Sequence, residues 1–159
     1  MRISTRGRYG LRAIIDLANN EYRGAIPLRE ISQRQNISEQ YLEQLFASLR
    51  KSGLVKSIRG AHGGYLLNDS PEKITVKDIL TALEGPIAPA DCVLSEDILE
   101  KCNNGGNCVT RKVWIMIKEN LEELLDSVTL AELKAESQNW GDYDQLISYS
   151  SDMNNKGVK

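Results

Sequence analysis

Three cysteines are the residues whose type and spacing point most directly to chemistry. Cys92, Cys102 and Cys108 form a C-x9-C-x5-C arrangement in a chain of 159 residues. An odd number of cysteines argues against a framework of disulfides. Thiolates are the usual protein ligands of iron–sulfur clusters, and Gly105-Gly106 would let the backbone wrap around one. The pattern therefore indicates a candidate cluster-binding loop.

Two other interpretations of the cysteines remain open from spacing alone. Structural zinc sites usually draw cysteines from C-x2–4-C pairs and use four closed ligands. The sequence has no such pair, so zinc is less favoured than a cluster. Three loosely exposed thiols without a metal fit the spacing as well as a cluster does.

The cysteine segment, residues 86–108, lies between two predicted helices. The helix before it opens with a capping pair, Thr75 and Asp78. The helix after it covers 110–126 and has apolar residues at helical spacing. These are Val113, Trp114, Ile117, Leu121, Leu124 and Leu125. The stripe is too long for one small domain to cover, so we expect it to pack against a second copy in a C2 homodimer, with burial inside one chain as the alternative.

The first part of the chain predicts a winged helix-turn-helix. Apolar periodicity gives a helix over 5–22, a short helix after Pro27 and a third helix over 39–52. Two apolar runs, Leu54–Ile58 and Tyr65–Leu67, then flank a glycine-rich tip that suits a hairpin. The expected fold class is mainly α with a small β-wing.

The domain organisation follows from these elements. We expect a DNA-binding domain over 1–85 and a cluster-binding loop over 86–108. A dimerisation helix and a short C-terminal helix, opened by a Thr129–Glu132 capping box, would occupy 109–137, and a flexible polar tail 138–159.

The third helix and the hairpin carry the residue types that read DNA. An α-helix fits the major groove, where Gln pairs with adenine and Glu accepts from cytosine. If Leu42, Leu45, Phe46 and Leu49 face the core, Gln40, Glu43, Gln44 and Ala47 face outward. The candidate DNA-binding residues are Ser38, Gln40, Tyr41, Glu43, Gln44, Arg50 and Lys51, with Arg59, Gly60 and His62 on the wing. A merely solvated helix face and loop imidazole are the alternatives.

The charge distribution supports a polyanionic partner for the first part alone. Residues 1–68 carry 11 Lys or Arg and 5 Asp or Glu, a net +6, whereas residues 69–159 net −8. The first 20 residues are interrupted by charges, and no apolar run approaches membrane-spanning length, so we expect a cytoplasmic protein. No nucleotide-binding glycine motif accompanies the cysteines, and a single histidine offers little acid–base chemistry, so we expect no enzyme.

Three runs resemble the IscR-like family of iron–sulfur-sensing winged-helix regulators. They are RISTRGRYGLRAIIDL over Arg2–Leu17, ISEQYLEQLFASLRKSG over Ile37–Gly53 and SIRGAHGGYLL over Ser57–Leu67. The similarity covers about residues 1–135. It implies a symmetric dimer on a palindromic operator of double-stranded DNA and a 2Fe–2S cluster on the three cysteines. It also implies base contacts from Ser38, Gln40 and Glu43, and a minor-groove contact from Arg59.

The sequence departs from the family where the fourth cluster ligand belongs. Position 111, a histidine in some relatives, is Arg111, and position 8, an aspartate in others, is Arg8. The first cysteine gap is also longer by four residues than the common family spacing. Candidate fourth ligands are Asp91, Asn103, Asn104, Asn107, Glu43 or an exchangeable water.

The sequence therefore predicts a transcriptional regulator that senses iron–sulfur cluster status. The first alternative is a winged-helix regulator controlled by thiol oxidation or by a protein partner, without a cluster. The second is an electron-transfer or redox protein.

Overall fold

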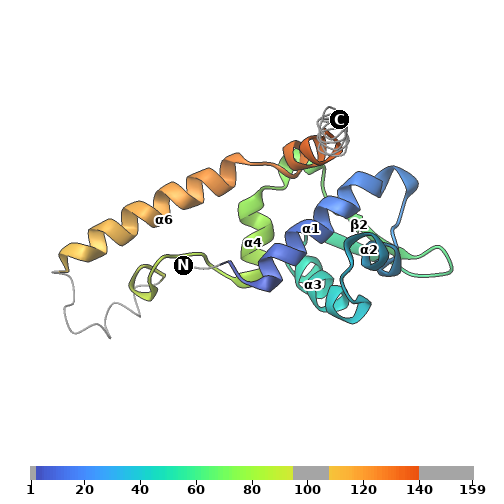
Figure 1. The fold of residues 1–159 in the computed structure, drawn as a ribbon, viewed down its shortest axis with the longest axis horizontal. Coiled ribbons are helices and arrows are strands. Elements are labelled where there is room, and N and C mark those ends of the chain that lie inside the picture. Colours follow the sequence, from blue (N-terminus) through green and yellow to red (C-terminus); the bar gives the residue numbers. More distant parts are fainter. Residues whose placement is uncertain (1–2, 95–107, 140–159) are drawn as a thin grey trace, which may run out of the picture.

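The computed structural model describes residues 3–94 and 108–139 (Figure 1). Its fold is mainly helical with a two-stranded antiparallel wing, which confirms the predicted fold class. In chain order the elements are α1 (Thr5–Asn20), the 3-10 helix η1 (Glu21–Arg23), α2 (Leu28–Gln35), α3 (Glu39–Lys51), β1 (Val55–Ile58), β2 (Gly64–Leu67), η2 (Pro71–Lys73), α4 (Val76–Glu84), η3 (Asp91–Val93) and α6 (Val109–Ser127). A further helix begins at 130 and is described to 139.

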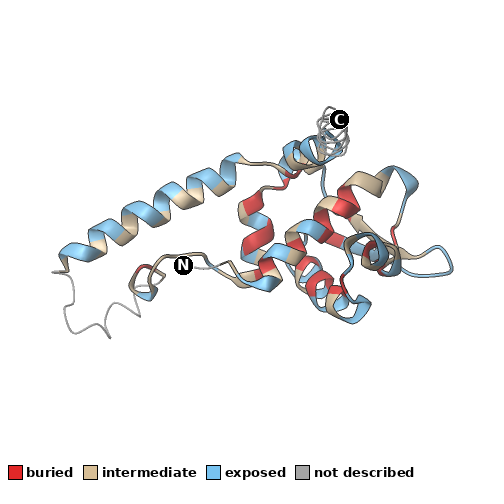
Figure 2. Ribbon diagram, in the orientation of Figure 1, coloured by how far each residue is buried: buried red, intermediate tan, exposed pale blue. Residues whose placement is uncertain are grey.

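The hydrophobic core lies among the first four helices, where Figure 2 shows most of the buried residues. Each of the four predicted inward residues of α3 is fully buried; they are Leu42, Leu45, Phe46 and Leu49. Ser38 begins α3 as an N-cap, and Asn36 just before it adopts the left-handed conformation that the tight turn from α2 needs. The predicted helix over 5–22 stops at Asn20 and continues as the 3-10 turn η1.

The wing is attached to the core by a third backbone segment that the sequence did not reveal. Strands β1 and β2 pair from Val55–Leu67 to Ile58–Gly64. Ile26 and Tyr65 exchange two backbone hydrogen bonds of 2.9 Å, so the segment just before α2 forms an antiparallel bridge with β2. Gly64 fits here because any Cβ would collide with the Ile26 backbone. The Tyr65 ring also packs edge-on against Phe46, with centroids 4.9 Å apart.

The end of the described chain returns to the winged domain. Val76 donates its backbone N–H to Val128 at 2.9 Å, and Leu130 donates to Ile74 at 2.8 Å. Leu130 is fully buried in the same core as α1 and α3. Both predicted capping boxes, Thr75–Asp78 and Thr129–Glu132, are present. The C-terminal helix therefore packs with the winged domain, while residues 140–159 of the predicted tail lie outside the described part.

Helix α6 extends away from the rest of the molecule (Figure 1). It contacts α4 and η3 along one side. Its other side is open: Val113 is 50% exposed, Ile117 40% and Leu124 60%. The protomer alone thus leaves much of the predicted stripe uncovered. Within the described ranges, no helix is both long and apolar enough to cross a membrane.

Candidate nucleic-acid interface and cysteine site

Helix α3 presents a polar face to solvent. Gln40, Glu43, Gln44 and Ala47 are all exposed, as the apolar spacing of the helix predicts. Their opposite face is fixed by the buried leucines and Phe46, so the outward direction of these side chains follows from packing. The arrangement places two amides and one carboxylate on the surface that could enter a DNA groove.

The beginning of α3 combines a cap with a free hydroxyl donor. The Ser38 Oγ accepts the backbone N–H of Tyr41 at 3.3 Å. Its hydroxyl proton is still available to donate to a phosphate oxygen. The Tyr41 ring is half-buried and lies edge-on to Tyr9 of α1, with centroids 6.2 Å apart. The side chain of Tyr41, a predicted DNA-contact residue, is therefore restricted by its packing against Tyr9.

The end of α3 and the wing supply cations on the same part of the molecule. Arg50 and Lys51 are exposed in the last turn of α3. Arg50 Nη1 donates to Ser57 Oγ on β1 at 3.3 Å and so joins the helix to the wing. Arg59 and His62 are exposed at the wing tip. Gly60 has a φ of 116°, which favours glycine at that point of the tip.

Helix α1 is bonded directly to the other two helices of the motif, which the sequence did not indicate. Arg6 Nη2 donates to Ser48 Oγ on α3. Asp16, only 5% exposed, accepts from Arg34 Nη2 at 2.7 Å and from Gln35 Nε2 at 2.9 Å, both on α2. A buried carboxylate needs such charged or polar partners to offset its desolvation. The contact between α1 and α2 could have been predicted from Asp16, because it is the single aspartate within the apolar stripe of the first helix.

Cys92 and Cys108 lie where the cysteine loop leaves and rejoins the described chain. Cys92 is in η3 and Cys108 is the N-cap residue of α6; both are half-buried and free. Cys108 Sγ is 3.1 Å from Thr110 Oγ1, at hydrogen-bond distance. This hydroxyl and the backbone N–H of Arg111 lower the pKa of Cys108 below its usual value, which favours the thiolate.

Arg111 connects the two ends of the loop. Its Nε donates to the Cys92 carbonyl at 3.4 Å, and its backbone N–H donates to the Cys108 carbonyl at 3.2 Å. Arg111 thus joins Cys92 to Cys108 through their backbone carbonyls. The third predicted ligand, Cys102, lies outside the described residues, as do Asn103, Asn104 and Asn107.

The described residues do not supply a complete metal site. Among residues 3–94 and 108–139, no group of three or more His, Cys, Asp or Glu side chains is placed to hold an ion. Asp91 is exposed beside Cys92. The wing, with His62, lies at the opposite end of the molecule from the start of α6 (Figure 1). The two described cysteines nevertheless fit an iron–sulfur group chemically, since thiols are its usual ligands, the pKa of Cys108 is lowered, and Arg111 contacts the backbone carbonyls of both.

A capped helix with an exposed polar face, packed beside a basic β-wing, defines a winged helix-turn-helix transcriptional regulator. The chain belongs to the Rrf2 family, described as iron-dependent transcriptional regulators, whose family model matches residues 3–136.

Two named transcriptional regulators, CymR and IscR, are among its relatives. The chain is 47% identical over 133 residues to the HTH-type transcriptional regulator CymR of Bacillus subtilis, covering 84% of this chain and 89% of the relative. It is 41% identical over 133 residues to IscR of Erwinia tasmaniensis, covering 84% and 78%. The solved structure of CymR, the global cysteine regulator of B. subtilis, matches with a TM-score of 0.70 at 46% identity over 86% of this chain and 98% of that one. The IscR-like resemblance is thereby confirmed, and CymR is similar as well.

Proposed function

We propose that this protein is a homodimeric transcriptional regulator that binds a palindromic operator and changes its binding with the state of its cysteine loop. The exposed polar face of α3 would read bases in the major groove through Gln40, Glu43 and Gln44. The wing would place Arg59 in the minor groove or on a phosphate. The single observation that carries this proposal is the exposed polar face of α3, a helix whose last turn is bonded to strand β1 of the wing through Arg50 and Ser57.

The proposed dimer rests on α6. Its exposed apolar residues need a cover that the described protomer does not provide, and a second copy supplies the same stripe by symmetry. Two recognition helices about one helical turn of DNA apart require a fixed spacing between protomers. A helix that joins the two copies and has Cys108 as its N-cap residue would link that spacing to the cysteine loop.

We further propose that Cys92, Cys102 and Cys108 hold an iron–sulfur cluster, most simply a 2Fe–2S cluster. When bound, such a group supplies a redox-active and exchangeable centre whose presence reports iron and sulfide supply. Support comes from the lowered pKa of Cys108, from Arg111 joining the loop ends, and from the similarity to IscR. A ligand shifts a conformational equilibrium only through different affinities for its states, and ordering the loop would provide that difference.

A second candidate function is a thiol-responsive regulator without a cluster. A cysteine thiol with a lowered pKa at the start of a helix favours this function. The chain is also similar to CymR, which is described as a global cysteine regulator. In this case oxidation of a thiol, rather than loss of iron, would alter operator binding. An electron-transfer role has no comparable support.

Anaerobic purification tests the cluster proposal. The parent protein should absorb visible light and contain stoichiometric iron and acid-labile sulfide. Cys92→Ala, Cys102→Ala and Cys108→Ala should each lose the absorbance and the sulfide while circular dichroism stays at the parental level. A colourless, iron-free parent whose operator binding responds to peroxide would instead establish the thiol-responsive function.

A further inference from the structure

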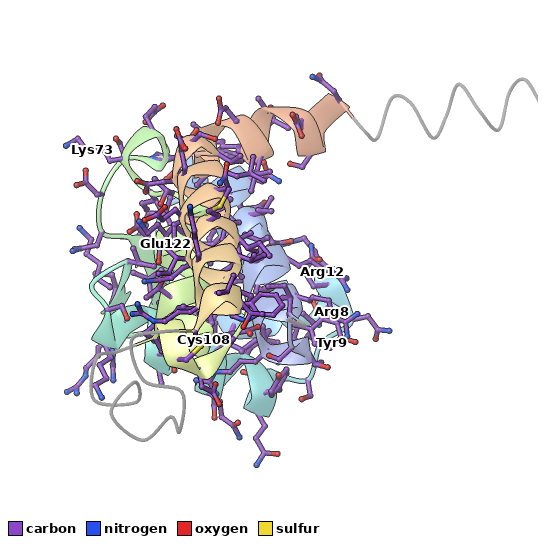
Figure 3. The ribbon with its side chains drawn as sticks, turned by 90° about the vertical axis from the view of Figure 1, so that its left-hand side faces the viewer. Arg8, Tyr9, Arg12, Lys73, Cys108 and Glu122 are labelled. Carbon is purple, nitrogen blue, oxygen red and sulfur yellow. The ribbon has the colours of Figure 1, made fainter. Side chains whose placement is uncertain are left out.

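One face of α1 carries a basic and aromatic group that the proposed DNA contacts do not use. It consists of Arg8, Tyr9 and Arg12, which we call the α1 basic face. Figure 3 shows the three residues on one side of the molecule, away from Lys73 on the other side. Arg8 and Arg12 are both exposed. Among residues 3–94 and 108–139, neither forms an ion pair, so both charges remain available to an anion.

The α1 basic face lies beside the beginning of the recognition helix. Tyr9 contacts Tyr41 of α3, with ring centroids 6.2 Å apart at an interplanar angle of 88°. Arg12 Nη2 donates to the backbone carbonyl of Gln35 at 2.9 Å, where α2 ends and the turn to α3 begins. Two contacts from different residues therefore place this face next to the turn that introduces α3.

Arg12 is held in position before any ligand binds. Its Nε and Nη2 each lie 3.3 Å from the Gln35 side-chain oxygen, and its guanidinium lies 5.5 Å from the centre of the Tyr9 ring. Arg8, one turn earlier, makes one long hydrogen bond of 3.4 Å to Thr5. Arg12 is therefore fixed by several contacts, whereas Arg8 can change its conformation. Arg12 can meet an anion in its present position, and Arg8 can move to form a closer contact with it.

The position of this face determines its partner. When the N-terminal residues of a recognition helix reach base edges, groups beside that helix end face the sugar–phosphate backbone that borders the groove. Phosphate contacts from arginine and tyrosine fix the register of a protein on DNA without reading sequence. The charge of the first part of the chain, net +6 over residues 1–68, is complementary to that backbone.

We propose that the α1 basic face binds DNA phosphates at the edge of the groove entered by α3. The partner is the sugar–phosphate backbone of double-stranded DNA, and the contact sets the orientation of α3 rather than the choice of operator. This inference rests on the proposed DNA-binding function and extends the contact surface from α3 and the wing to α1.

The salt dependence of operator binding tests the proposal, with Arg8→Gln as the main variant. Each lost phosphate contact lowers the slope of log affinity against log salt by about one, hence by about two for a dimer. The ratio of parental to variant affinity should then fall on the order of tenfold between 50 and 200 mM salt. The loss should be the same on every operator sequence.

Lys73→Gln is the matched control, because it removes the same charge on the other side of the molecule (Figure 3). It should keep the parental slope. Thermal unfolding at the parental temperature would establish that Arg8→Gln is folded. Arg12→Lys, which keeps the charge but loses the paired contacts to Gln35, should weaken binding with a smaller change in slope.

Parental affinity and slope for Arg8→Gln would overturn the proposal, as would a changed preference among operators, since that would indicate base reading. If Glu43→Ala and Arg59→Ala alter binding while Arg8→Gln does not, the proposed function stands and this inference alone fails. If the parent binds no DNA, both fail.

Discussion

The carboxylate of Glu84, at the end of α4, accepts two hydrogen bonds from Ser4, the N-cap residue of α1. One comes from the Ser4 backbone N–H at 3.0 Å and one from its hydroxyl at 2.9 Å. Glu84 is followed directly by Gly85 and Pro86, which lead into the cysteine segment. Because Arg6 of α1 is bonded to Ser48 of α3, the end of α4 and the helix α3 are joined through three described hydrogen bonds.

The contact between α1 and α4 predicts an energetic coupling between Gly7 and Glu84. A Cβ at Gly7 would occupy the space of the Glu84 carboxylate, so Gly7→Ala should displace it and break both bonds to Ser4. Those bonds contribute about 0.5–1.5 kcal/mol each, while alanine favours the helix by about 1 kcal/mol. With Glu84→Ala already present, Gly7→Ala should become stabilising. Urea unfolding of the double-mutant cycle should give a coupling of about 1–2 kcal/mol.

Gly10→Ala is the control for this cycle. Its Cβ would overlap the buried Leu83 side chain, so overpacking should cost about 1–3 kcal/mol with or without Glu84→Ala. Additivity of Gly7→Ala and Glu84→Ala within about 0.3–0.5 kcal/mol would show that the carboxylate does not constrain α1.

Leu130 predicts that the segment after α6 stabilises the winged domain. Its side chain is fully buried in the core formed by the first helices. Leu130→Ala should therefore lower the free energy of unfolding by about 2–5 kcal/mol, as for other buried leucines. Tyr22→Ala, at a residue that is 82% exposed, should cost about 0.5 kcal/mol or less. Urea unfolding at one fixed protein concentration compares them, and equal costs would place Leu130 outside the core in solution.

The exposed stripe of α6 predicts that dimerisation depends on Ile117. Ile117→Glu would bury a charge at the centre of the proposed contact, so the protein should sediment as a monomer and bind its operator less tightly. Lys112→Gln makes the net charge more negative by the same unit at an exposed polar position and should remain dimeric. A fully dimeric Ile117→Glu protein would contradict the proposed interface.

The residues proposed to face DNA predict two different phenotypes. Arg59→Ala should weaken binding to every operator by about 1–3 kcal/mol, because the wing loses a groove or phosphate contact. Glu43→Ala should instead change which operators bind, since the carboxylate restricts its partner to bases that donate a hydrogen bond. Titration of a small operator library separates the two effects. Unchanged affinity of Arg59→Ala on all members would exclude the wing from the interface.

Elements with a local signature were predictable from the sequence. The buried face of α3 followed from the spacing of Leu42, Leu45, Phe46 and Leu49, and both capping boxes followed from an i, i+3 pair. Each depends on residues within one or two turns. Because the apolar residues of this helix face the core, Gln40, Glu43 and Gln44 had to point outward.

Contacts between distant segments had no such signature. Ile26 pairs with Tyr65, and residues 74–76 are hydrogen-bonded to residues 128–130. These contacts form only when distant parts of the chain come together, and the periodicity of apolar residues does not predict which parts do so. The glycines of α1 carried an unused signal. Gly7 and Gly10, three residues apart inside a helix, each forgo about 1 kcal/mol of helix stability, which indicates close approach of another element.

The most direct test of the central claim is operator affinity measured anaerobically for three forms of the protein. These are the cluster-loaded parent, the same protein after chelation of its iron, and the variant with Cys92, Cys102 and Cys108 all replaced by alanine. If the cysteine loop senses a cluster, the loaded form should differ from the other two in affinity or operator preference, while the chelated and triple-variant forms agree and all three stay dimeric. Identical affinities and preferences for all three would contradict cluster sensing and leave DNA binding as the remaining function.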